Sequence, residues 1–566
     1  MKKIAGITLL ALFISTSFLP SGALAAELSP SVSRWLETSG PGETVAVWVF
    51  FTDKGRRTPA ETERDLIDAA ASFTPAAVER RLRARGAMPF DERDLPLLES
   101  NVRAVRDTGA GVRAFSKWLN AMTVEATAAQ VERIAGLPSV ARLSRVSGRK
   151  GGPEPVMTLG AAPPAPLSGD YGESWRQLEL IEVPMLHDEG YSGTGIKVAI
   201  FDTGFWLSHE TFAALNVIAE WDFINDDPVT ENEPGDQDNQ HYHGTMCLSL
   251  IGGRTVGTLI GPAYDAEYIL AKTEDMSQED PVEEDWWIEA AEWADSLGAR
   301  IITSSLCYND WYTYEDMDGN TAPITIAADI AVENGIVVVN AAGNSGSSTW
   351  KYILAPADGH NVISVGSVDS TGTRSYWSSQ GPTYDGRIKP TIMTMGDEAF
   401  VADPLGGASA YRRGDGTSFA APLAAGAICL MLEKNPLWGP PDVLDALLAT
   451  STLASSPDTL YGYGIVRAHA ASEYPQAGLA SPGPAGTGIS IYPNPTTSEF
   501  LMSHPGRAGR ARIFDVAGRL VGEVALSPAG VTVVDLDRLG GAAAAARGVY
   551  FIEAGGAGTA KVLILK

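Results

Sequence analysis

The chain has 566 residues, which is more than one hydrophobic core normally supports, so we expect about two to four domains. Its 45% apolar and 20% charged residues are typical of a soluble globular protein. The net charge of −27 is concentrated in residues 151–475, where 13 basic residues stand against 47 acidic ones, and this argues against a nucleic-acid partner because phosphates would repel such a domain.

The first residues have the layout of a secretory signal peptide. Two lysines precede an apolar run from Ile4 to Leu19, and the triplet Ala-Leu-Ala follows. We therefore predict that residues 1–25 are removed before Ala26 and that the protein is exported. A membrane anchor is the alternative, but polar residues and a proline leave the run short for a bilayer span. No later stretch is apolar for long enough, so we expect no transmembrane segment in the mature chain.

Residues 26–150 are expected to form a small α+β unit. The run TVAVWVFFT is typical of a strand, and residues 121–146 follow the pattern strand, helix, strand. The next segment, GRKGGPEPVMTLGAAPPAPLSGDYG, is rich in Gly and Pro and has no apolar period. We interpret it as an exposed linker and a candidate cleavage region.

Residues 151–475 are expected to form the main domain. Strands are predicted at KVAIF, YILAK, IITSS, IVVVN and VISVGS, and helices near 284–298, 321–334, 418–434 and 441–450. This alternation indicates an α/β fold, with a mostly parallel sheet that carries helices on both faces. Catalytic groups in such folds lie at the carboxyl ends of the strands.

The end of the chain has a different pattern. The stretch PQAGLASPGPAGTG predicts a flexible linker at 476–488. From 489 to 566, short strands alternate with Asn, Gly and Pro, which predicts a small β-sandwich.

Two motifs of the main domain supply an acid and a base. In VAIFDTG, a buried strand delivers Asp202 to its end, where Thr203 and Gly204 turn the chain. A carboxylate in this position can orient an imidazole without being fully solvated. In HGTM, His243 opens an apolar helical run over 246–251 that can be buried behind it.

The stretch RGDGTSFAAPLAAG places one serine between loop residues and small apolar ones. Gly414 and Gly416 permit a tight loop. Ser418 then falls at a helix start, where backbone N–H groups lack intrahelical partners and point toward developing negative charge. Pro422 is tolerated near the first turn, and the alanines let the helix pack closely. The pattern predicts an exposed nucleophile on a fixed helix.

A fourth motif, VVVNAAGNSG, ends a buried strand at Asn344. In acyl transfer, its amide could join the backbone N–H of Ser418 in holding an oxyanion, an effect worth on the order of 100- to 1000-fold in rate. Each motif alone fits a plain structural role such as packing or capping. The four together favour catalysis.

The motifs DTG, HGT, AAGN and GTSFAAP, in this order, resemble the subtilisin-like serine proteases over roughly Gln177 to Ala468. The resemblance implies that Ser418 is the nucleophile and His243 the general base and then the acid. It implies that Asp202 orients the imidazole and that Asn344 is an oxyanion donor. No cofactor is required for this chemistry.

The resemblance also implies extended edges that bind the substrate backbone, at Ser305, Leu306, Cys307, Ala342 and Gly343. Cys307 stands where the family usually has glycine, so its side chain would narrow or reshape the groove. Two further departures, the phenylalanine after the nucleophile and the methionine after HGT, remove no catalytic group. They leave the subsite preferences open.

Two further interpretations concern the histidines: a competing base and a metal site. His209 could compete with His243 as the base, but it lacks the following Gly-Thr, and we expect it to make a structural hydrogen bond. His241 and His243 follow two aspartates, yet two imidazoles without a third ligand are weak evidence for zinc.

We predict no metal residues. The acidic runs 225–239 and 274–285 are more typical of solvated loops, and neither has a recognised calcium-loop spacing. A structural calcium ion, which many family members bind, is left open without a site. The three cysteines, Cys247, Cys307 and Cys429, have no paired spacing, so we expect buried free thiols.

The stretch WLNAMTVEATAAQVERIAGLPSVARLSRV resembles the end of propeptides that assist folding and block the active site in this family. Residues 27–150 carry a net charge of +3 (19 minus 16) against −34 (13 minus 47) for 151–475, which favours electrostatic docking. We predict that residues 26 to about 150 form a prodomain that inhibits its own enzyme and is removed by self-cleavage in the linker.

The tail motifs YPNPTTSEF, IFDVAGRLV, ARGVYFIEA and AKVLILK resemble type IX sorting and FlgD-like sandwich tails of secreted proteins in some Gram-negative bacteria. This implies an export machinery as a partner, and an extracellular or cell-surface location. A carbohydrate-binding or adhesive sandwich is the alternative.

The sequence thus predicts a secreted serine endopeptidase, made as a precursor, that acts on polypeptides through an acyl-enzyme. Two alternatives stay open. One is a catalytically silent homologue that binds peptides in the same groove, and the other is an enzyme that hydrolyses esters or small amides.

Overall fold

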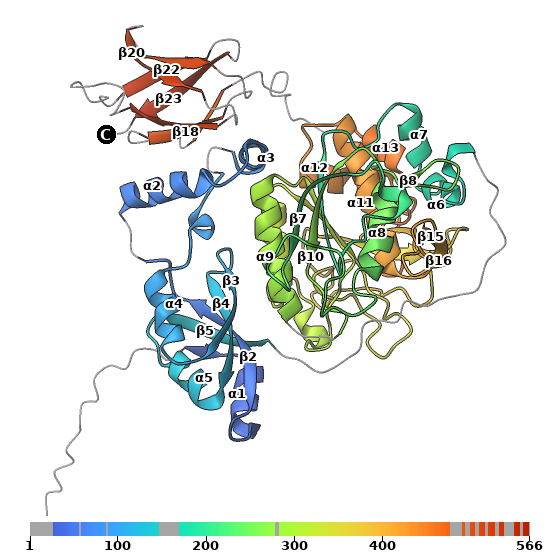
Figure 1. Ribbon diagram of the computed structural model, residues 1–566, viewed down its shortest axis with the longest axis horizontal. Coiled ribbons are helices and arrows are strands. Elements are labelled where there is room, and N and C mark those ends of the chain that lie inside the picture. Colours follow the sequence, from blue (N-terminus) through green and yellow to red (C-terminus); the bar gives the residue numbers. More distant parts are fainter. Residues whose placement is uncertain are drawn as a thin grey trace, which may run out of the picture.

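The computed structural model describes residues 26–55, 58–86, 89–146, 169–277, 282–475, 489–492, 499–503, 509–515, 519–526, 531–536, 548–554 and 558–564. The predicted signal peptide at 1–25, most of the predicted cleavage linker and the tail linker at 476–488 lie outside these residues. The chain forms an N-terminal unit (26–146), a central unit (169–475) and a C-terminal unit (489–564), which Figure 1 shows in blue, green to orange, and red.

The N-terminal unit is built on a five-stranded sheet with the order β1-β5-β2-β4-β3. Its strands are β1 (Glu27–Leu28), β2 (Thr44–Phe51), β3 (Gly111–Ser116), β4 (Ala121–Thr127) and β5 (Val140–Val146). One face shares a core with α1 (Pro30–Thr38), α4 (Glu99–Arg106) and α5 (Ala128–Ala135). Because side chains alternate along a strand, Val47 and Val49 enter this core while Trp48 joins the core of the central unit. The predicted α+β unit is confirmed.

A helical segment between β2 and α4 was not predicted. It contains α2 (Pro59–Ala70), α3 (Pro75–Arg85) and a 3-10 turn, η1 (Glu92–Asp94). Thr58 and Thr74 cap the two helices, each with a proline in the first turn. The segment has a small core of its own, which includes Ile67, Phe73 and Phe90. We call residues 58–95 the helical arm.

The central unit is a seven-stranded sheet with the order β14-β13-β12-β11-β6-β10-β7, and all six neighbouring pairs are parallel. Its strands are β6 (Lys197–Asp202), β7 (Asn216–Asp222), β10 (Glu267–Lys272), β11 (Ile301–Ser304), β12 (Val337–Ala341), β13 (Ile363–Val368) and β14 (Ile392–Met395). The five predicted strands are confirmed. The two that were missed, β7 and β14, are the edges of the sheet; β7 is half exposed, whereas all four residues of β14 are buried.

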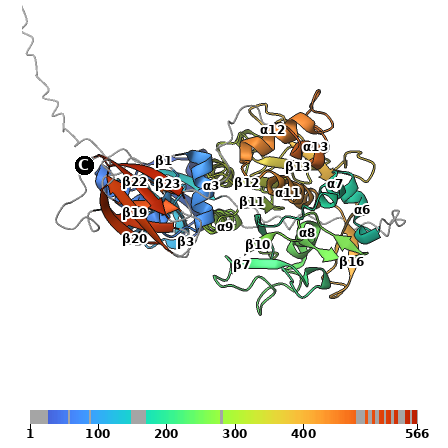
Figure 2. The ribbon, with the colours of Figure 1, turned by 90° about the horizontal axis from the view of Figure 1, so that it is seen from above.

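Helices cover both faces of this sheet, as predicted. On one side lie α8 (Tyr242–Gly252) and α11 (Thr417–Lys434), which share a core with Val198 and Ile200 of β6. On the other side lie α9 (Val282–Leu297) and α10 (Pro323–Glu333), which share a core with Ala199 and Phe201. The N-terminal unit lies against the α9 side, as the view from above shows (Figure 2).

Shorter elements complete the central unit. The helices are α6 (Trp175–Glu179), α7 (Val183–Asp188), α12 (Pro440–Thr450) and α13 (Ala468–Ser472), with 3-10 turns η2 (Gly169–Tyr171), η3 (Glu210–Phe212) and η4 (Tyr314–Asp316). Two antiparallel pairs are β8 (Arg254–Thr255) with β9 (Leu259–Ile260), and β15 (Ala399–Ala402) with β16 (Tyr411–Gly414).

The C-terminal unit consists of two antiparallel sheets, ordered β17-β18-β21 and β20-β19-β22-β23. The strands are β17 (Ser490–Tyr492), β18 (Glu499–Ser503), β19 (Arg510–Asp515), β20 (Leu520–Ala525), β21 (Val531–Asp535), β22 (Gly548–Ala554) and β23 (Gly558–Ile564). Phe500 and Val534 of the first sheet share a core with Ile513 and Ile552 of the second. The predicted small sandwich is confirmed.

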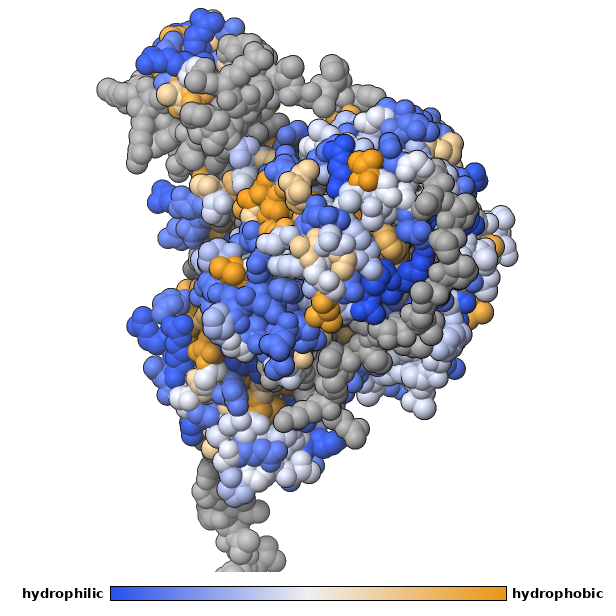
Figure 3. Space-filling view, turned by 45° about the vertical axis from the view of Figure 1, so that its right-hand side comes forward, coloured by the Kyte–Doolittle hydropathy of each residue, from blue (hydrophilic) through white to orange (hydrophobic). Residues whose placement is uncertain are grey.

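Polar residues cover most of the face seen in Figure 3, and apolar residues form separate patches on it. Among the helices in the described part of the chain, none combines the length and the apolar composition needed to cross a bilayer.

Candidate active site

Asp202 and His243 are brought together at the carboxyl end of the parallel sheet. Asp202 ends β6 and is fully buried, and its Oδ1 lies 2.7 Å from Nδ1 of His243 in the first turn of α8. Two glycines permit this approach. A Cβ on Gly204, where φ is +127°, would lie 2.6 Å from the Thr230 carbonyl oxygen, and one on Gly244 would lie 2.2 Å from the Gly204 carbonyl oxygen. The glycines of DTG and HGT are therefore steric requirements of the site.

The Asp202 carboxylate sets the charge state of the imidazole. Burial by itself lowers the pKa of His243 and is the largest single effect. The negative charge of Asp202, its hydrogen bond to the imidazole and the nearby Cys247 act together in the opposite direction and hold this pKa well above its usual value of 6.5. Because Nδ1 faces the carboxylate, Nε2 is the atom left to exchange a proton with a reacting group.

Ser418 lies in the first turn of α11, directly after Thr417, as the sequence predicts. Its Oγ donates a hydrogen bond to the Ser305 carbonyl oxygen at 3.2 Å, and the Ser305 hydroxyl donates to the Ser418 carbonyl oxygen at 2.7 Å. In the described part of the chain, the Ser418 hydroxyl thus bonds to Ser305 and not to His243. The helices that carry the two side chains are adjacent, because Sγ of Cys247 lies 3.8 Å from Nδ1 of His243 and 3.5 Å from the Ser418 carbonyl oxygen.

Thr417 fixes the amide of Asn344. Oδ1 of Asn344 accepts hydrogen bonds from the backbone N–H of Thr417 at 2.9 Å and from its hydroxyl at 3.0 Å. An amide whose oxygen is held in this way has its NH₂ group in a defined direction. Sequence reasoning missed this role for Thr417, although the residue stands in the GTS motif that was used to find Ser418.

The candidate substrate-binding residues follow two adjacent parallel strands. Ser305, Leu306 and Cys307 follow β11. Cys307 is partly exposed, and its Sγ lies 3.2 Å from the Ala341 carbonyl oxygen. Asn340 is fully buried and donates from Nδ2 to the Leu306 carbonyl oxygen at 3.0 Å. This hydrogen bond holds the segment that follows β11.

Ala342 and Gly343 follow β12, and their backbone N–H groups are used within the protein. Ala342 donates to the Val365 carbonyl oxygen at 3.0 Å, and Gly343 donates to the Thr417 hydroxyl at 3.1 Å. Gly343 has φ of +101°, and a Cβ there would lie 2.4 Å from the Leu354 side chain. This segment can form a wall of the groove, but these two donors do not face a substrate.

His209 and His241, the two histidines considered as alternatives, make hydrogen bonds to the backbone. His209 accepts from the Thr211 N–H at Nδ1 (3.3 Å) and donates from Nε2 to the Ala410 carbonyl oxygen (2.9 Å), so it makes the structural hydrogen bonds that were expected. His241 accepts from the Asn232 N–H at Nδ1 (3.1 Å).

Three groups of described residues come close enough to hold a metal ion: Asp202, His243 and Cys247; Glu189, His469 and Glu473; and Asp222, Asp227 and Glu233. The first is the candidate catalytic site. In the second, the Lys434 ammonium pairs with both glutamates. In the third, Nζ of Lys272 lies 2.7 Å from Asp222. A single lysine cannot neutralise all the carboxylates of either group, so both groups keep a net negative charge. The three cysteines are free, as predicted, and Cys247 and Cys429 are buried, but Cys307 is partly exposed, contrary to the prediction.

Each of the three units matches a known protein family. The subtilase family matches residues 193–464, the Peptidase S8 propeptide domain of Bacteroidota matches 46–154, and the secretion system C-terminal sorting domain matches 490–565. The chain is 33% identical over 294 residues to subtilisin E of Bacillus subtilis (strain 168), which covers 52% of this chain and 70% of the relative. It has the same identity to subtilisin of Bacillus pumilus, covering 96% of that relative.

Two solved structures also align with about half of this chain. The MycP3 protease from the type VII (ESX-3) secretion system aligns with 56% of this chain and 92% of its own, at 22% identity and a TM-score of 0.45. A protease from Pseudoalteromonas arctica aligns with 54% of this chain and 98% of its own, at 22% identity and a TM-score of 0.41.

Proposed function

The chain belongs to the subtilase family of serine peptidases, and from this premise we propose that it is a secreted endopeptidase in which Asp202, His243 and Ser418 form the catalytic triad. The observation that carries this proposal is the convergence of three elements. The end of β6 carries the buried carboxylate of Asp202, the start of α8 carries the imidazole of His243, and the start of α11 carries Ser418.

The chemistry begins with a rotation of the Ser418 side chain from the Ser305 carbonyl toward His243. Nε2 takes the hydroxyl proton as Oγ attacks the carbonyl carbon of the scissile peptide. Asp202 stabilises the imidazolium that forms. When the tetrahedral intermediate collapses, the proton passes to the leaving amine and an acyl-enzyme remains. Water then repeats the sequence and releases the acid, which restores Ser418.

Asn344 and the helix start would stabilise the oxyanion. The Asn344 amide is oriented by Thr417, and the backbone N–H of Ser418 lies in the first turn of α11, where intrahelical acceptors are lacking. We assign Ser305, Leu306 and Cys307 to the edge that pairs with substrate backbone, and Ala342 and Gly343 to the adjoining wall. Cys307 narrows the groove relative to a glycine.

We further propose that the N-terminal unit, with the boundary near residue 150, is a prodomain that this enzyme removes from itself. Its contacts with α9 support the proposal that it stays docked on the central unit as an inhibitor. Glu292 accepts from the Ser116 hydroxyl at 2.7 Å and from the Trp118 N–H at 3.0 Å, and Glu289 accepts from the Phe115 N–H at 3.1 Å.

The C-terminal sorting domain indicates export. We propose that residues 489–566 engage a type IX export machinery and that the mature enzyme acts outside a Gram-negative cell on polypeptides. The chemistry needs no cofactor. Calcium dependence is tested by whether a chelator lowers the melting temperature.

A fluorophosphonate probe tests the catalytic assignment. We expect processed protein to be labelled at Ser418 and to degrade casein. Ser418→Ala should lose labelling, lose about 10⁶-fold in kcat and accumulate as unprocessed precursor in a protease-free host. Processed protein that takes no label would indicate a peptide-binding homologue instead. Labelled protein that cleaves esters but not casein would indicate an esterase or amidase.

A further inference from the structure

The prodomain touches the central unit at two separate places. The first is its sheet, whose Trp48 face packs on α9 and α10. The second is the helical arm, which lies at the other end of α9, where Figure 1 shows α3 beside the helix terminus. The contact is close: a Cβ on Gly298 or Gly335, the glycines that follow α9 and α10, would lie 3.0 Å from Ala76 and 2.9 Å from Ala84 of α3.

Arg80 of α3 closes the ends of both helices of the central unit. Its guanidinium donates to the carbonyl oxygens of Asp295 (3.2 Å), Ala299 (2.6 Å) and Asn334 (3.1 Å). The last carbonyl groups of a helix lack intrahelical donors and carry the negative end of its dipole. The Asp295 carbonyl also accepts from the Gly298 N–H, whereas Ala299 and Asn334 follow the ends of α9 and α10. Arg80 therefore places a buried cation where both helix dipoles end.

Asp295 joins Arg80 and Arg81 in a buried ion cluster. The Asp295 carboxylate pairs with both guanidinium groups, and all three side chains are at most 4% exposed. Arg81 also pairs with Asp94 of the arm at 2.8 Å and lies over the Phe73 and Phe90 rings, with its guanidinium 4.7 and 4.9 Å from their centroids. Arg81 thus bonds both within the arm and to the central unit, whereas the contacts of Arg80 described above all go to the central unit.

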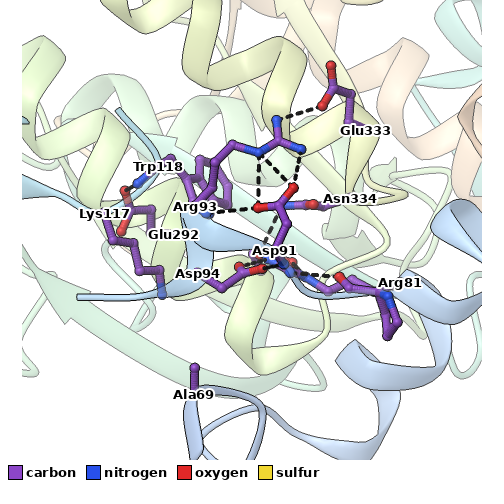
Figure 4. Close-up of polar contacts among 12 residues, drawn as sticks. Ala69, Arg81, Asp91, Arg93, Asp94, Lys117, Trp118, Glu292, Glu333 and Asn334 are labelled. Carbon is purple, nitrogen blue, oxygen red and sulfur yellow. Dashed lines mark hydrogen bonds and ion pairs between the residues drawn. The ribbon is translucent and has the colours of Figure 1, made fainter. Parts of the chain in front are cut away.

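Further contacts surround this cluster. Figure 4 shows Arg93 between Asp91 of the arm and Glu333 of the central unit, to which it donates at 2.6 Å. Arg85 donates to Oδ1 of Asn334 at 3.1 Å. Lys54, at the root of the arm, donates to the carbonyl oxygens of Leu95 and Lys117, each at 2.6 Å, and so ties the arm to the sheet that carries it.

We propose that the ends of α9 and α10, centred on Asp295, are a second docking surface for the prodomain, and that the arm keeps the cleaved prodomain bound to the mature enzyme. This inference rests on the proposed self-processing. Cleavage in the linker cuts no contact of the arm, so the prodomain leaves only when the buried cluster is broken. Breaking one member of such a cluster leaves an uncompensated buried charge, which costs a factor on the order of 100 or more in affinity.

Arg80→Ala tests the proposal in the full-length chain. The substitution leaves with the prodomain, so the mature enzyme is chemically identical to the parent and any change in latency comes from prodomain binding. We expect the dissociation rate of the cleaved prodomain to rise about 100-fold. Size exclusion and the lag before peptide hydrolysis would both measure this rate. Arg103→Ala is the matched control, because it removes an exposed arginine of the same prodomain that pairs with the exposed Glu99 of its own helix.

A second measurement keeps the two proposals separate. In the inactive Ser418→Ala precursor, Arg80→Ala should increase hydrogen exchange in α3 and at the end of α9 whether or not the enzyme processes itself. Asp295→Asn, on the other side of the contact, should have the same effect and covers the case in which Arg80→Ala fails to fold. Equal exchange and equal lag in Arg80→Ala, Asp295→Asn and the Arg103→Ala control would overturn the second docking surface. Processing by the Ser418→Ala chain alone would overturn only self-cleavage.

Discussion

Thr417 of α11 holds the amide of Asn344, which lies beyond the end of β12 at Ala341 and not at the strand end as predicted. This gives the oxyanion assignment a sharp test. Asn344→Leu should lower kcat by about 100- to 1000-fold and leave KM nearly unchanged, because the lost hydrogen bond forms only as the oxyanion develops. Steady-state kinetics on a soluble peptide would measure this. Thr417→Ser keeps the hydroxyl that bonds Oδ1 and serves as the control. A raised KM at full kcat would mean that Asn344 binds the ground state.

The charge on Asp202 predicts the pH profile. His243 works as a base only when it is neutral, and the carboxylate holds its pKa above 6.5. The acid limb of kcat/KM should therefore lie at higher pH than for an ordinary imidazole. Asp202→Asn should lower kcat by about 10⁴-fold and move the limb to lower pH, since burial then acts without the opposing charge. A limb that stays in place in this variant would mean that another group titrates.

These side chains could be predicted because the chemistry constrains short stretches. The glycines of DTG and HGT are required where the backbone of β6 meets α8, so the motif and its geometry have one cause. The roles of Thr417 and Asn340 could not be predicted, since each depends on a hydrogen bond to a loop that follows another strand. No periodicity encodes such a pairing.

Helix α11 is fully buried over most of its length, and its small residues set how close its neighbours lie. A Cβ on Gly426 would lie 2.8 Å from the Pro262 ring. Alanine in place of a helical glycine normally stabilises by about 1 kcal/mol, but overpacking costs about 1–3 kcal/mol. We expect Gly426→Ala to lower the free energy of unfolding by about 1 kcal/mol.

Chemical denaturation of the Ser418→Ala chain, which avoids autolysis, would measure this change. Gly439→Ala controls for the added methyl group alone, because Gly439 is the N-cap of α12 and a Cβ there would lie no closer than 3.8 Å to its neighbours. Equal stability of the two variants would show that the loop at Pro262 shifts without cost.

The strands of the central sheet were predictable for a related reason. β6, β11 and β12 are buried on both faces and read as continuous apolar runs, whereas the edge strand β7 is half exposed and contains Asn216, Glu220 and Asp222. The apolar signal therefore weakens at β7, whereas β14 is buried along its whole length, so exposure does not explain why that strand was missed.

The helical arm shows where local reasoning ends for the molecule as a whole. The sequence ERRLRAR has the composition of a solvated basic helix, yet Arg80 and Arg81 are buried. Their partner, Asp295, lies 215 positions from Arg80 in the chain. Net charge indicated that the two units attract each other, but only the fold identifies the carboxylate that receives the arginines.

The interface between the prodomain and α9 also carries carboxyls that respond to pH. Burial under the prodomain raises the pKa of Glu289 from 4.5 to about 7 and raises that of Glu292. At Glu289, the Phe115 N–H lowers the pKa and the charge of Asp226 raises it further. At Glu292, the charge of Lys117 lowers the pKa. A raised pKa means that the complex binds protons which the separated, solvated carboxyls would lose. Docking should therefore weaken as pH rises from about 5 to 7.

We expect the cleaved prodomain to dissociate faster at pH 7.5 than at pH 5.5, with its affinity falling by up to about tenfold per pH unit for each proton lost. Lys54, whose pKa burial lowers to about 8, acts in the opposite sense only at higher pH. Size exclusion of the processed complex across this range measures the effect. Glu289→Gln should flatten the dependence, because the amide carries no proton to lose. Dissociation that slows with rising pH, or an unchanged slope in Glu289→Gln, would contradict a role for Glu289 in release.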